Sequence, residues 1–318
     1  MTQASRELTH SPRTTWLPYV MLAGASLFWA GNAITGRALR GDISPVGINF
    51  GRWLVALVIL LPLTYRALVA QWPLVRANGR LFLALGLTGV TIFQTCLYLA
   101  LQTTTAINST LFFSLTPVVI VALSWVLWRE RLVRPQILGI LLSLIGALFL
   151  IMQGKLAHLL AFQFNQGDLW MVLAVILWAI YSVLLKKLPP TLAQPVILTA
   201  TVLAGMLFLL PAFIITTLAG AALHLTPLNG LGILYVGIFP SVLAFLFWNR
   251  GVSVIGPNKA GMYLHLMPVF GAILSFLFLD EGLAVYHLIG AALVFGGIVL
   301  MSRGAAASQN ISATNFTN

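Results

Sequence analysis

The stretch LFLALGLTGVTIFQTCLYLALQTTTAINSTLFFSLTPVVIVALSWVLW, residues 81–128, decides the fold, because it runs for 48 residues without a charged side chain. A membrane-spanning helix needs about 20 mostly apolar residues, since the hydrocarbon core is about 30 Å thick and each helical residue rises about 1.5 Å. The stretch is long enough for two such helices, and the polar run at 102–105 offers a turn between them. It therefore predicts a protein that crosses a bilayer more than once.

The composition of the whole chain leads to the same conclusion. Of 318 residues, 60% are apolar and 7% are charged, whereas roughly a quarter of an ordinary soluble domain is charged. So few charges cannot cover a water-exposed surface, and a lipid bilayer must therefore solvate most of the exterior. The net charge of +11 does not predict a nucleic-acid partner, because the basic residues lie between apolar runs, where they orient helices. The single cysteine, Cys96, lies inside an apolar run and provides neither a disulfide nor a cysteine metal site.

The gaps between charged residues predict ten membrane-spanning helices. Each apolar run is continuous rather than alternating at a period of two, which excludes the strands of a membrane barrel. The expected fold class is therefore an all-α integral membrane protein. The predicted spans lie within residues 14–36, 43–65, 81–128 (two spans), 135–154, 169–185, 188–249 (two spans), 260–279 and 282–302.

The distribution of basic residues predicts the orientation. With the N-terminus in the cytoplasm, thirteen Lys and Arg residues fall in cytoplasmic segments and three fall outside. Basic residues favour the cytoplasmic side, and an even number of spans returns the chain to the side on which it began. We therefore expect a multi-pass protein of the inner membrane with both termini in the cytoplasm.

The two halves of the chain resemble each other. Phe28-Trp29-Ala30 in the first predicted span matches Leu177-Trp178-Ala179 in the sixth. Each half holds five spans, an odd number, so the second half must cross the membrane inverted relative to the first, as in many alternating-access transporters. At a constant shift of 151 residues, Pro117 falls on Pro268, Glu130 on Glu281, Gly139 on Gly290 and Gly146 on Gly297.

The chain also resembles a known family, the EamA type of the drug/metabolite transporter superfamily, over roughly residues 17–303. The resemblance rests on Phe28-Trp29-Ala30-Gly31-Asn32, on Ser114-Leu115-Thr116-Pro117 leading to Glu130, and on Met267-Pro268 leading to Asp280-Glu281. It implies ten helices, a central cavity, and export of amino acids or related small metabolites. It divides the chain into a cytoplasmic tail (1–15), a first EamA-like five-helix repeat (16–154), a linker (155–167), a second such repeat (168–303) and another cytoplasmic tail (304–318).

Motifs of enzymes and nucleotide-driven pumps are missing from the sequence. It contains no G-x-x-x-x-G-K-[ST] loop and no H-E-x-x-H motif, and no span carries a pair of carboxylates. We therefore expect no catalytic residue, no metal and no cofactor. A membrane-embedded enzyme that modifies lipids is the least favoured alternative, because no metal–diphosphate or nucleophile site is recognisable.

Arg52 is the charged residue that stands out within a predicted span. A charge at that depth costs about 2.5–3.5 kcal/mol on insertion scales. Arg52 either anchors a substrate carboxylate through two parallel hydrogen bonds, or snorkels outward, or bonds the carbonyl end of a neighbouring helix. Asn49, one turn earlier, shares its face and fits each alternative.

Aromatic and polar residues near the middle of several spans are candidates for a cavity lining. Trp29 and Asn32 lie one turn apart in the first span, and Trp178 and Tyr181 have the same spacing in the sixth. Each candidate also fits plain packing or a hydrogen bond between helices. The further candidates for substrate binding are Gln94, Tyr98, Ser114, Trp248, Asn249, Tyr263 and His265.

Four residues are candidates for structural or gating roles. Pro117 and Pro268 should each kink a helix and free a carbonyl, at Phe113 and at Leu264. Glu130 and Glu281 come at helix ends, where ion pairs that close the cytoplasmic face are favoured over substrate binding.

His265 is the only histidine expected well inside a span. Because histidine titrates near neutrality, His265 either binds substrate and senses pH or bonds a neighbouring helix as a neutral imidazole. No carboxylate occupies the middle of a span, which argues against a dedicated exporter of cations. The expected substrate is a small neutral or zwitterionic metabolite carried by alternating access, and a channel or facilitator is the alternative. The oligomeric partner and the coupling ion stay open.

Overall fold

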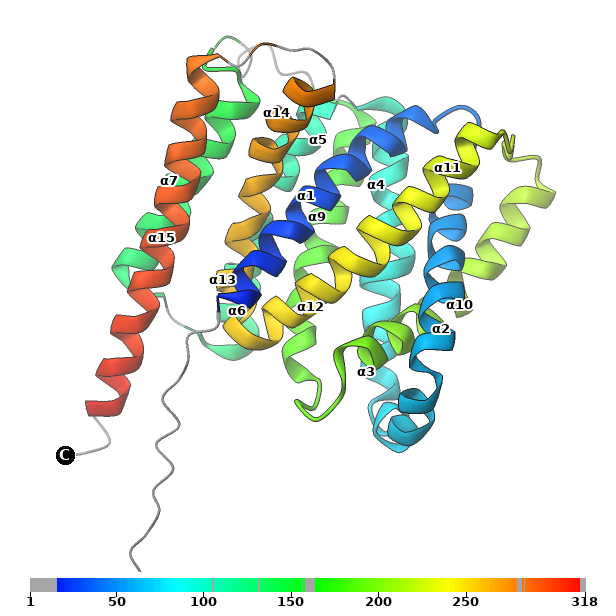
Figure 1. The fold of residues 1–318 in the computed structure, drawn as a ribbon, viewed down its shortest axis with the longest axis horizontal. Helices are drawn as coiled ribbons and strands as arrows, with labels where there is room; N and C mark the ends of the chain where they lie inside the picture. Colours follow the sequence, from blue (N-terminus) through cyan, green and yellow to red (C-terminus); the bar gives the residue numbers. More distant parts are fainter. Residues whose placement is uncertain are drawn as a thin grey trace, which may run out of the picture.

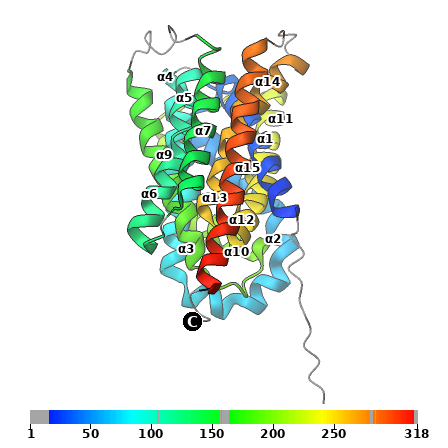
Figure 2. The same cartoon turned by 90° about the vertical axis from the view of Figure 1, so that its left-hand side faces the viewer.

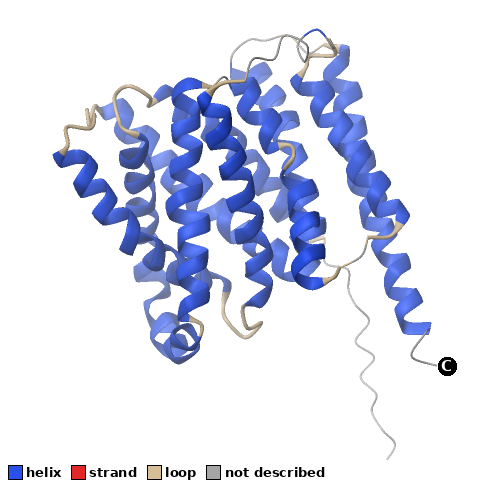
Figure 3. Ribbon diagram, turned by 180° about the vertical axis from the view of Figure 1, so that it is seen from behind, coloured by secondary structure: helices blue, strands red, loops and turns tan. Residues whose placement is uncertain are grey.

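The computed structural model describes residues 16–104, 106–130, 132–155, 157, 164–278, 282 and 284–314. Within these ranges the chain is helical, and the only strand-like pairing is a single bridge between Ile43 and Leu223. Figure 1 shows the helices side by side, and Figure 3 shows the same arrangement from behind, coloured by secondary structure. The all-α fold class is confirmed.

The elements of the structure follow one another with short connections. They are α1 (Leu17–Ala38), α2 (Pro45–Ala77), α3 (Gly79–Leu85), the π-helix η1 (Gly86–Thr91), α4 (Ile92–Thr103), α5 (Ala106–Phe113), α6 (Thr116–Trp128), α7 (Arg134–Ile151), α9 (Gln166–Leu184), the 3-10 helix η2 (Leu185–Lys187), α10 (Gln194–Leu218), α11 (Pro227–Val236), the π-helix η3 (Gly237–Leu243), α12 (Ala244–Ile255), α13 (Pro257–Gly261), the 3-10 helix η4 (Met262–His265), α14 (Leu266–Phe278) and α15 (Val285–Thr314).

Nine helices of the described ranges are long and apolar enough to cross a membrane. The predicted span within residues 260–279 is not among them. The chain there forms α13, η4 and α14, and residue 279 lies outside the described ranges. In Figure 2 the chain enters α1 and leaves α15 on the same, lower side of the bundle. The count of ten crossings therefore stays a prediction.

α2 is longer than the predicted second span. It begins after Ser44, whose hydroxyl accepts a hydrogen bond from the Gly47 amide, and it continues to Ala77 through Pro62 and Pro73. Charged side chains limit the part of a helix that lies in lipid but do not stop the helix itself, so a span read from charge gaps ends too early.

Two π-helical segments widen the third and eighth candidate spans. η1 begins at Gly86 and η3 at Gly237, so the same shift of 151 residues relates their first residues. Both glycines meet a neighbouring helix closely: a Cβ on Gly86 would lie 2.5 Å from the Gly205 amide nitrogen, and a Cβ on Gly237 would lie 2.6 Å from Val55. The sequence analysis did not predict these segments.

The four repeat-related glycines form a seam between α7 and α15. The two helices run antiparallel, and a Cβ on Gly139 would lie 2.7 Å from the Gly297 carbonyl oxygen, while a Cβ on Gly146 would lie 2.8 Å from that of Gly290. Small residues permit this backbone-to-backbone approach between membrane helices. We call Gly139, Gly146, Gly290 and Gly297 the glycine seam.

Helices from the two halves pack on each other in matching pairs. α4 packs on α9 as α12 packs on α1, and α6 packs on α9 as α14 packs on α1, while α2 packs on α10. The centre of the bundle is consequently built by α1, α4, α9 and α12 together. This arrangement brings the middle of the first predicted span next to the middle of the sixth.

Candidate functional site

A central recess lies between α1, α4, α5, α9 and α14, with a cavity volume of about 40 Å³. A second recess of about 280 Å³ shares Ala33, Thr110 and Met267 with it and reaches Gln153 and Tyr286. We call this second recess the mouth, because it reaches the end of the bundle where α7 ends and α15 begins. The central recess is lined by Trp29, Asn32, Ala33, Phe93, Gln94, Leu97, Ser109, Thr110, Phe113, Met171, Trp178 and Met267.

Four of the predicted binding residues line this recess: Trp29, Asn32, Gln94 and Trp178. Trp29 and Asn32 share one face of α1 because they are one helical turn apart. The indole N–H of Trp29 donates a hydrogen bond of 3.0 Å to the carbonyl of Pro240 in η3. The widened turn of η3 thus fixes the ring that borders the recess.

Arg52 lies behind the recess and is fully buried. Its Nε donates to the Ser241 hydroxyl at 2.7 Å, and its Nη1 contacts Gln94 Oε1 at 2.7 Å. The same Nη1 contacts the Tyr98 hydroxyl at 2.9 Å and Asn32 Oδ1 at 3.3 Å. Tyr98 in turn donates to Asn32 Oδ1 at 2.9 Å. The prediction that Arg52 snorkels outward is wrong, because these partners hold it inside the protein, and they are side chains rather than the carbonyl end of a helix.

The charge of Arg52 has no counter-ion among the described residues. Its four partners are neutral, and the ion pair found within those ranges joins Lys186 and Glu130 elsewhere in the chain. Nη2 has no hydrogen-bond partner in the described part of the chain, although the guanidinium carbon lies 5.4 Å from the Trp53 ring centre. A buried charge that is solvated only by neutral dipoles leaves a positive potential beside the recess.

Asn49 does not line the recess. Its side-chain nitrogen donates to the carbonyls of Val90 and Thr91 at 3.0 Å each, and to the Thr95 hydroxyl at 3.0 Å. The two carbonyls belong to η1, where the π-helical turn interrupts the regular hydrogen-bond ladder. Asn49 therefore satisfies backbone groups of η1, as a helix-to-helix bond would.

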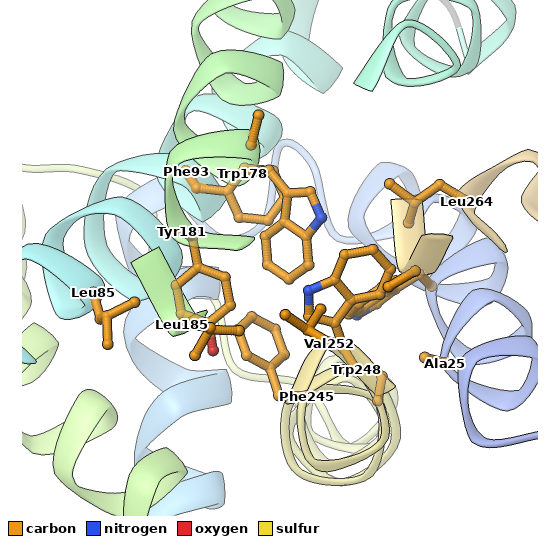
Figure 4. Packing of buried hydrophobic residues seen from close by; sticks show 14 of the residues in the cluster. Ala25, Leu85, Phe93, Trp178, Tyr181, Leu185, Phe245, Trp248, Val252 and Leu264 are labelled. Carbon is orange, nitrogen blue, oxygen red and sulfur yellow. The ribbon is translucent and has the colours of Figure 1, made fainter. Parts of the chain in front are cut away.

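Five aromatic rings close the recess on the side away from the mouth. Trp178 is central: its ring centre lies 5.0 Å from Trp29, 5.5 Å from Trp248 and 5.3 Å from Phe245, and it stacks on Tyr181 at 5.1 Å. Figure 4 shows Trp178, Tyr181, Phe245 and Trp248 converging between α9 and α12. We call these five residues the aromatic floor. None of them is more than 6% exposed.

Asn249, another residue predicted to bind substrate, lies next to the aromatic floor. Tyr181 donates to Asn249 Oδ1 at 2.8 Å, which joins α9 to α12 beneath the recess. The indole nitrogens of Trp178 and Trp248 and the amide nitrogen of Asn249 are buried without a partner in the described ranges. The floor is thus mainly apolar, with hydrogen-bond donors left unused.

His265 lies outside the recess and is fully buried. Its Nε2 is 2.9 Å from the Ser114 carbonyl, and its Nδ1 is 2.7 Å from the Ser143 hydroxyl. A carbonyl can only accept, so Nε2 carries the hydrogen and Nδ1 accepts from Ser143. A neutral imidazole is fully satisfied here, which favours the structural interpretation of His265.

Ser114 and Tyr263 are also placed away from the recess lining. The Ser114 hydroxyl donates to the Thr110 carbonyl at 2.9 Å. The ring of Tyr263 lies 6.2 Å from that of Tyr19, and its carbonyl accepts a hydrogen bond of 2.6 Å from Ser26. These two residues connect helices rather than line the cavity.

The proline positions coincide with breaks in the helices. The chain leaves α5 at Phe113 and starts α6 at Thr116, just before Pro117. The Phe113 carbonyl, which we expected to be freed, accepts a hydrogen bond of 2.6 Å from the Thr116 hydroxyl. Pro268 follows the 3-10 turn η4 and lines the mouth.

Glu130 lies at the end of the bundle opposite the mouth. It forms an ion pair with Lys186 after α9, and Asn258 at the start of α13 donates to its Oε2 at 2.9 Å. The contacts of Glu130 thus join the end of α6 to η2 and to α13, on the far side of the aromatic floor. Glu281 lies outside the described residues.

Several residues of the lining were not predicted from the sequence. Ser109 on α5 is the clearest, because its hydroxyl is buried without a partner in the described ranges. Ser241, which binds Arg52, was also missed, although a serine after Pro240 in an apolar span was a usable signal. Met171, Met267 and Phe93 carry no signal that separates a lining residue from a packing residue.

Comparisons with known proteins agree with this architecture. The model of the EamA-like transporter family matches residues 16–152 and 165–303. The uncharacterized transporter YetK of Bacillus subtilis is 31% identical over 281 residues, covering 88% of this chain and 85% of that protein. A probable terminal-alkyne amino-acid exporter of Streptantibioticus cattleyicolor is 26% identical over 221 residues, covering 69% of this chain and 71% of that protein.

The fold is also similar to that of a solved crystal structure, with a TM-score of 0.70 and 19% identity, covering 89% of this chain and 96% of the other. That likeness concerns the fold alone. The family model, in contrast, matches both halves of the sequence over most of their length. The chain belongs to the EamA-like transporter family.

Proposed function

We propose that this protein exports amino acids or similar small neutral or zwitterionic metabolites across the inner membrane by alternating access. The observation that carries the proposal is the central recess, which opens through the mouth at one end and is closed at the other by the aromatic floor. Its lining comes from both halves of the chain. The name of the Streptantibioticus relative supports amino acids as the first substrates to examine.

The architecture we propose is ten crossings in two inverted five-helix repeats, 16–154 and 168–303, joined by the linker 155–167. In it, α13, η4 and α14 together make the ninth crossing. The matching helix pairs, the two π-helical segments and the glycine seam all support this relation, because each is repeated at an equivalent position.

The residues at the recess and at the helix breaks have proposed roles. Trp29, Asn32, Gln94 and Trp178 contact the substrate. Tyr98 and Arg52 hold the side-chain amides of Asn32 and Gln94 in place. Pro117 and Pro268 mark the breaks at which helices bend during the cycle. The Glu130–Lys186 pair and Asn258 keep the cytoplasmic end shut while the mouth is open.

Counterflow in proteoliposomes tests the transport mechanism. Vesicles loaded with one unlabelled amino acid should accumulate the same labelled amino acid transiently, and the Trp29→Ala variant should lose this accumulation while staying folded. A flux that shows no counterflow and does not saturate would favour the channel alternative instead.

Cysteine labelling tests the orientation. Arg40 and Arg80 are both exposed; Arg40 lies in the connection before α2, and Arg80 lies at the start of α3, just after the other end of α2. In a Cys96→Ala background, an impermeant thiol reagent should label Arg40→Cys in intact cells but not Arg80→Cys. Labelling of Arg80→Cys from outside would overturn the proposed topology.

A further inference from the structure

The polar groups of the central recess are nearly all hydrogen-bond donors. Arg52 has only donors, so it forces the side-chain oxygens of Asn32 and Gln94 to turn toward it. The side-chain NH₂ groups of both amides are then left for the recess, which both residues line. Neither NH₂ group has a hydrogen-bond acceptor in the described part of the chain.

Two further groups add to this set. Trp178 and Ser109 line the recess, and the Trp178 indole N–H and the Ser109 hydroxyl are buried without a hydrogen-bond partner among the described residues. Trp178 is 1% exposed and Ser109 is 4% exposed. Leaving such groups unpaired is costly. The Trp178 N–H is complemented by an acceptor on the ligand, and the Ser109 hydroxyl can pair with an acceptor or with a donor.

The electrostatic potential of the recess also favours a ligand with acceptor atoms and negative charge. The buried charge of Arg52 lies one side chain away from the recess, and no Asp or Glu belongs to the lining. An ammonium group would meet donors and a positive potential, whereas a carboxylate offers two acceptor oxygens and a negative charge. The remaining lining is apolar, with Phe93, Leu97 and Met171 among its members.

We infer that the recess recognises its substrate by a carboxylate, carried on an apolar body, and that the amino group of an amino acid is dispensable. This inference rests on the proposed transport function and specifies its substrate class. The carboxylate lies against the NH₂ groups of Asn32 and Gln94 and the N–H of Trp178. Arg52 is a positioning residue, since it orients the two amides and supplies charge without touching the substrate.

Three probes of one shape separate the alternatives. L-Leucine carries both groups, 2-hydroxy-4-methylpentanoate keeps the carboxylate without the amine, and L-leucinamide keeps the amine without the carboxylate. Binding to the purified full-length protein in detergent is followed by tryptophan fluorescence, because Trp29 and Trp178 border the recess. Both acids should bind within about threefold of each other, and leucinamide at least about tenfold more weakly.

The Gln94→Glu variant tests the donor set. A glutamate still accepts from Arg52 in the same place, but it removes an NH₂ group from the recess and neutralises the guanidinium. Affinity for both acids should fall at least about tenfold relative to leucinamide. Gln71→Glu is the matched control, because Gln71 Oε1 accepts from the Ala193 amide far from the recess, and it should bind as the wild type does.

The inference is overturned if leucinamide binds as tightly as the acids, if none of the probes binds, or if a folded Gln94→Glu variant keeps its preference for acids. The wild-type probe series decides the matter even if Gln94→Glu does not fold. Counterflow that persists in spite of any of these results would leave the transport function standing. Binding of acids without counterflow would remove the transport function and leave the carboxylate site.

Discussion

The two halves of the molecule make the same hydrogen bond with the residue types exchanged. In the first half, Tyr98 on α4 donates to Asn32 on α1 at 2.9 Å. In the second half, Tyr181 on α9 donates to Asn249 on α12 at 2.8 Å. Each bond joins the first and third candidate spans of its own half, so a tyrosine–asparagine contact at this level is part of the common scaffold.

The surroundings of the two bonds are different. Arg52 and Gln94 surround the first, whereas Phe245 and Trp248 surround the second. At the shift of 151 residues, Gln94 corresponds to Phe245 and Arg52 to Leu203. The first half therefore supplies the charge and both amides, and the second half supplies Trp178, Tyr181, Phe245 and Trp248 of the aromatic floor. Equivalent positions of the two halves thus differ in polarity, with Arg52 and Gln94 in the first half and Leu203 and Phe245 in the second.

The largest difference between the halves should appear on replacing Arg52. In Arg52→Met the free energy of unfolding should fall by about 2–4 kcal/mol, because four contacts between helices are lost and such a contact is worth about 0.6 kcal/mol on average. Leu203→Met, at the equivalent position, should cost less than about 1.5 kcal/mol. Thermal unfolding in detergent measures both, and equal unfolding temperatures for the two variants would remove the asymmetry.

The tyrosine pair should show a smaller difference. Tyr98→Phe removes a donor to Asn32 and an acceptor for Arg52, while Tyr181→Phe removes one bond to Asn249. We expect a loss of about 1–3 kcal/mol for the first and about 0.6–1.7 kcal/mol for the second. Transport should follow the same order. If Tyr181→Phe proves the more damaging, the first half is not the specialised one.

The two tryptophans beside the recess sharpen the comparison further. Trp29→Phe removes the hydrogen bond to the Pro240 carbonyl, and Trp178→Phe removes an N–H that has no partner in the described ranges. The apolar loss is similar in both, so Trp29→Phe should be less stable than Trp178→Phe by about 0.6–1.7 kcal/mol. The same unfolding assay tests this, and a more stable Trp29→Phe would contradict the geometry.

The smallest effect is expected at His265, whose partner Ser114 is its repeat-equivalent residue. His265→Gln keeps one donor and one acceptor, and the neutral imidazole it replaces is already satisfied by Ser114 and Ser143. The dependence of transport on pH between about 5.5 and 8 should therefore not change. A displaced pH profile in an active variant would show that this contact between the halves titrates during the cycle.

The helical class of the fold could be predicted because the bilayer is the solvent of most of the chain. Long charge-free runs form helices in a bilayer, because only a helix satisfies its own backbone hydrogen bonds there. The places where the helices change to π-helical or 3-10 turns could not be predicted in this way. η1, η3 and η4 change the hydrogen-bond ladder without changing the apolar character of the sequence, and hydropathy registers only the latter.

Among the residues predicted to bind substrate, those that line the recess contrast with their spans, and their role in binding stays a prediction. Trp29, Asn32, Gln94 and Trp178 stand out among aliphatic neighbours, and all four line the recess. Spacing along one helix predicts which residues share a face but not which helix that face meets. For this reason His265 and Asn49 were grouped with the lining residues, whereas in the structure they bind Ser143 and the carbonyls of η1.

The glycine seam has a consequence for biosynthesis. α7 is translated well before α15, yet the backbone surface at Gly139 and Gly146 packs against α15. At about 5–20 residues per second, the ribosome needs on the order of 10–30 s to travel from Gly139 to Gly297. During that interval lipid must occupy the groove of α7, and the final helix has to displace it. Insertion of α15, rather than insertion of the first helices, is thus the step at which the glycine seam forms.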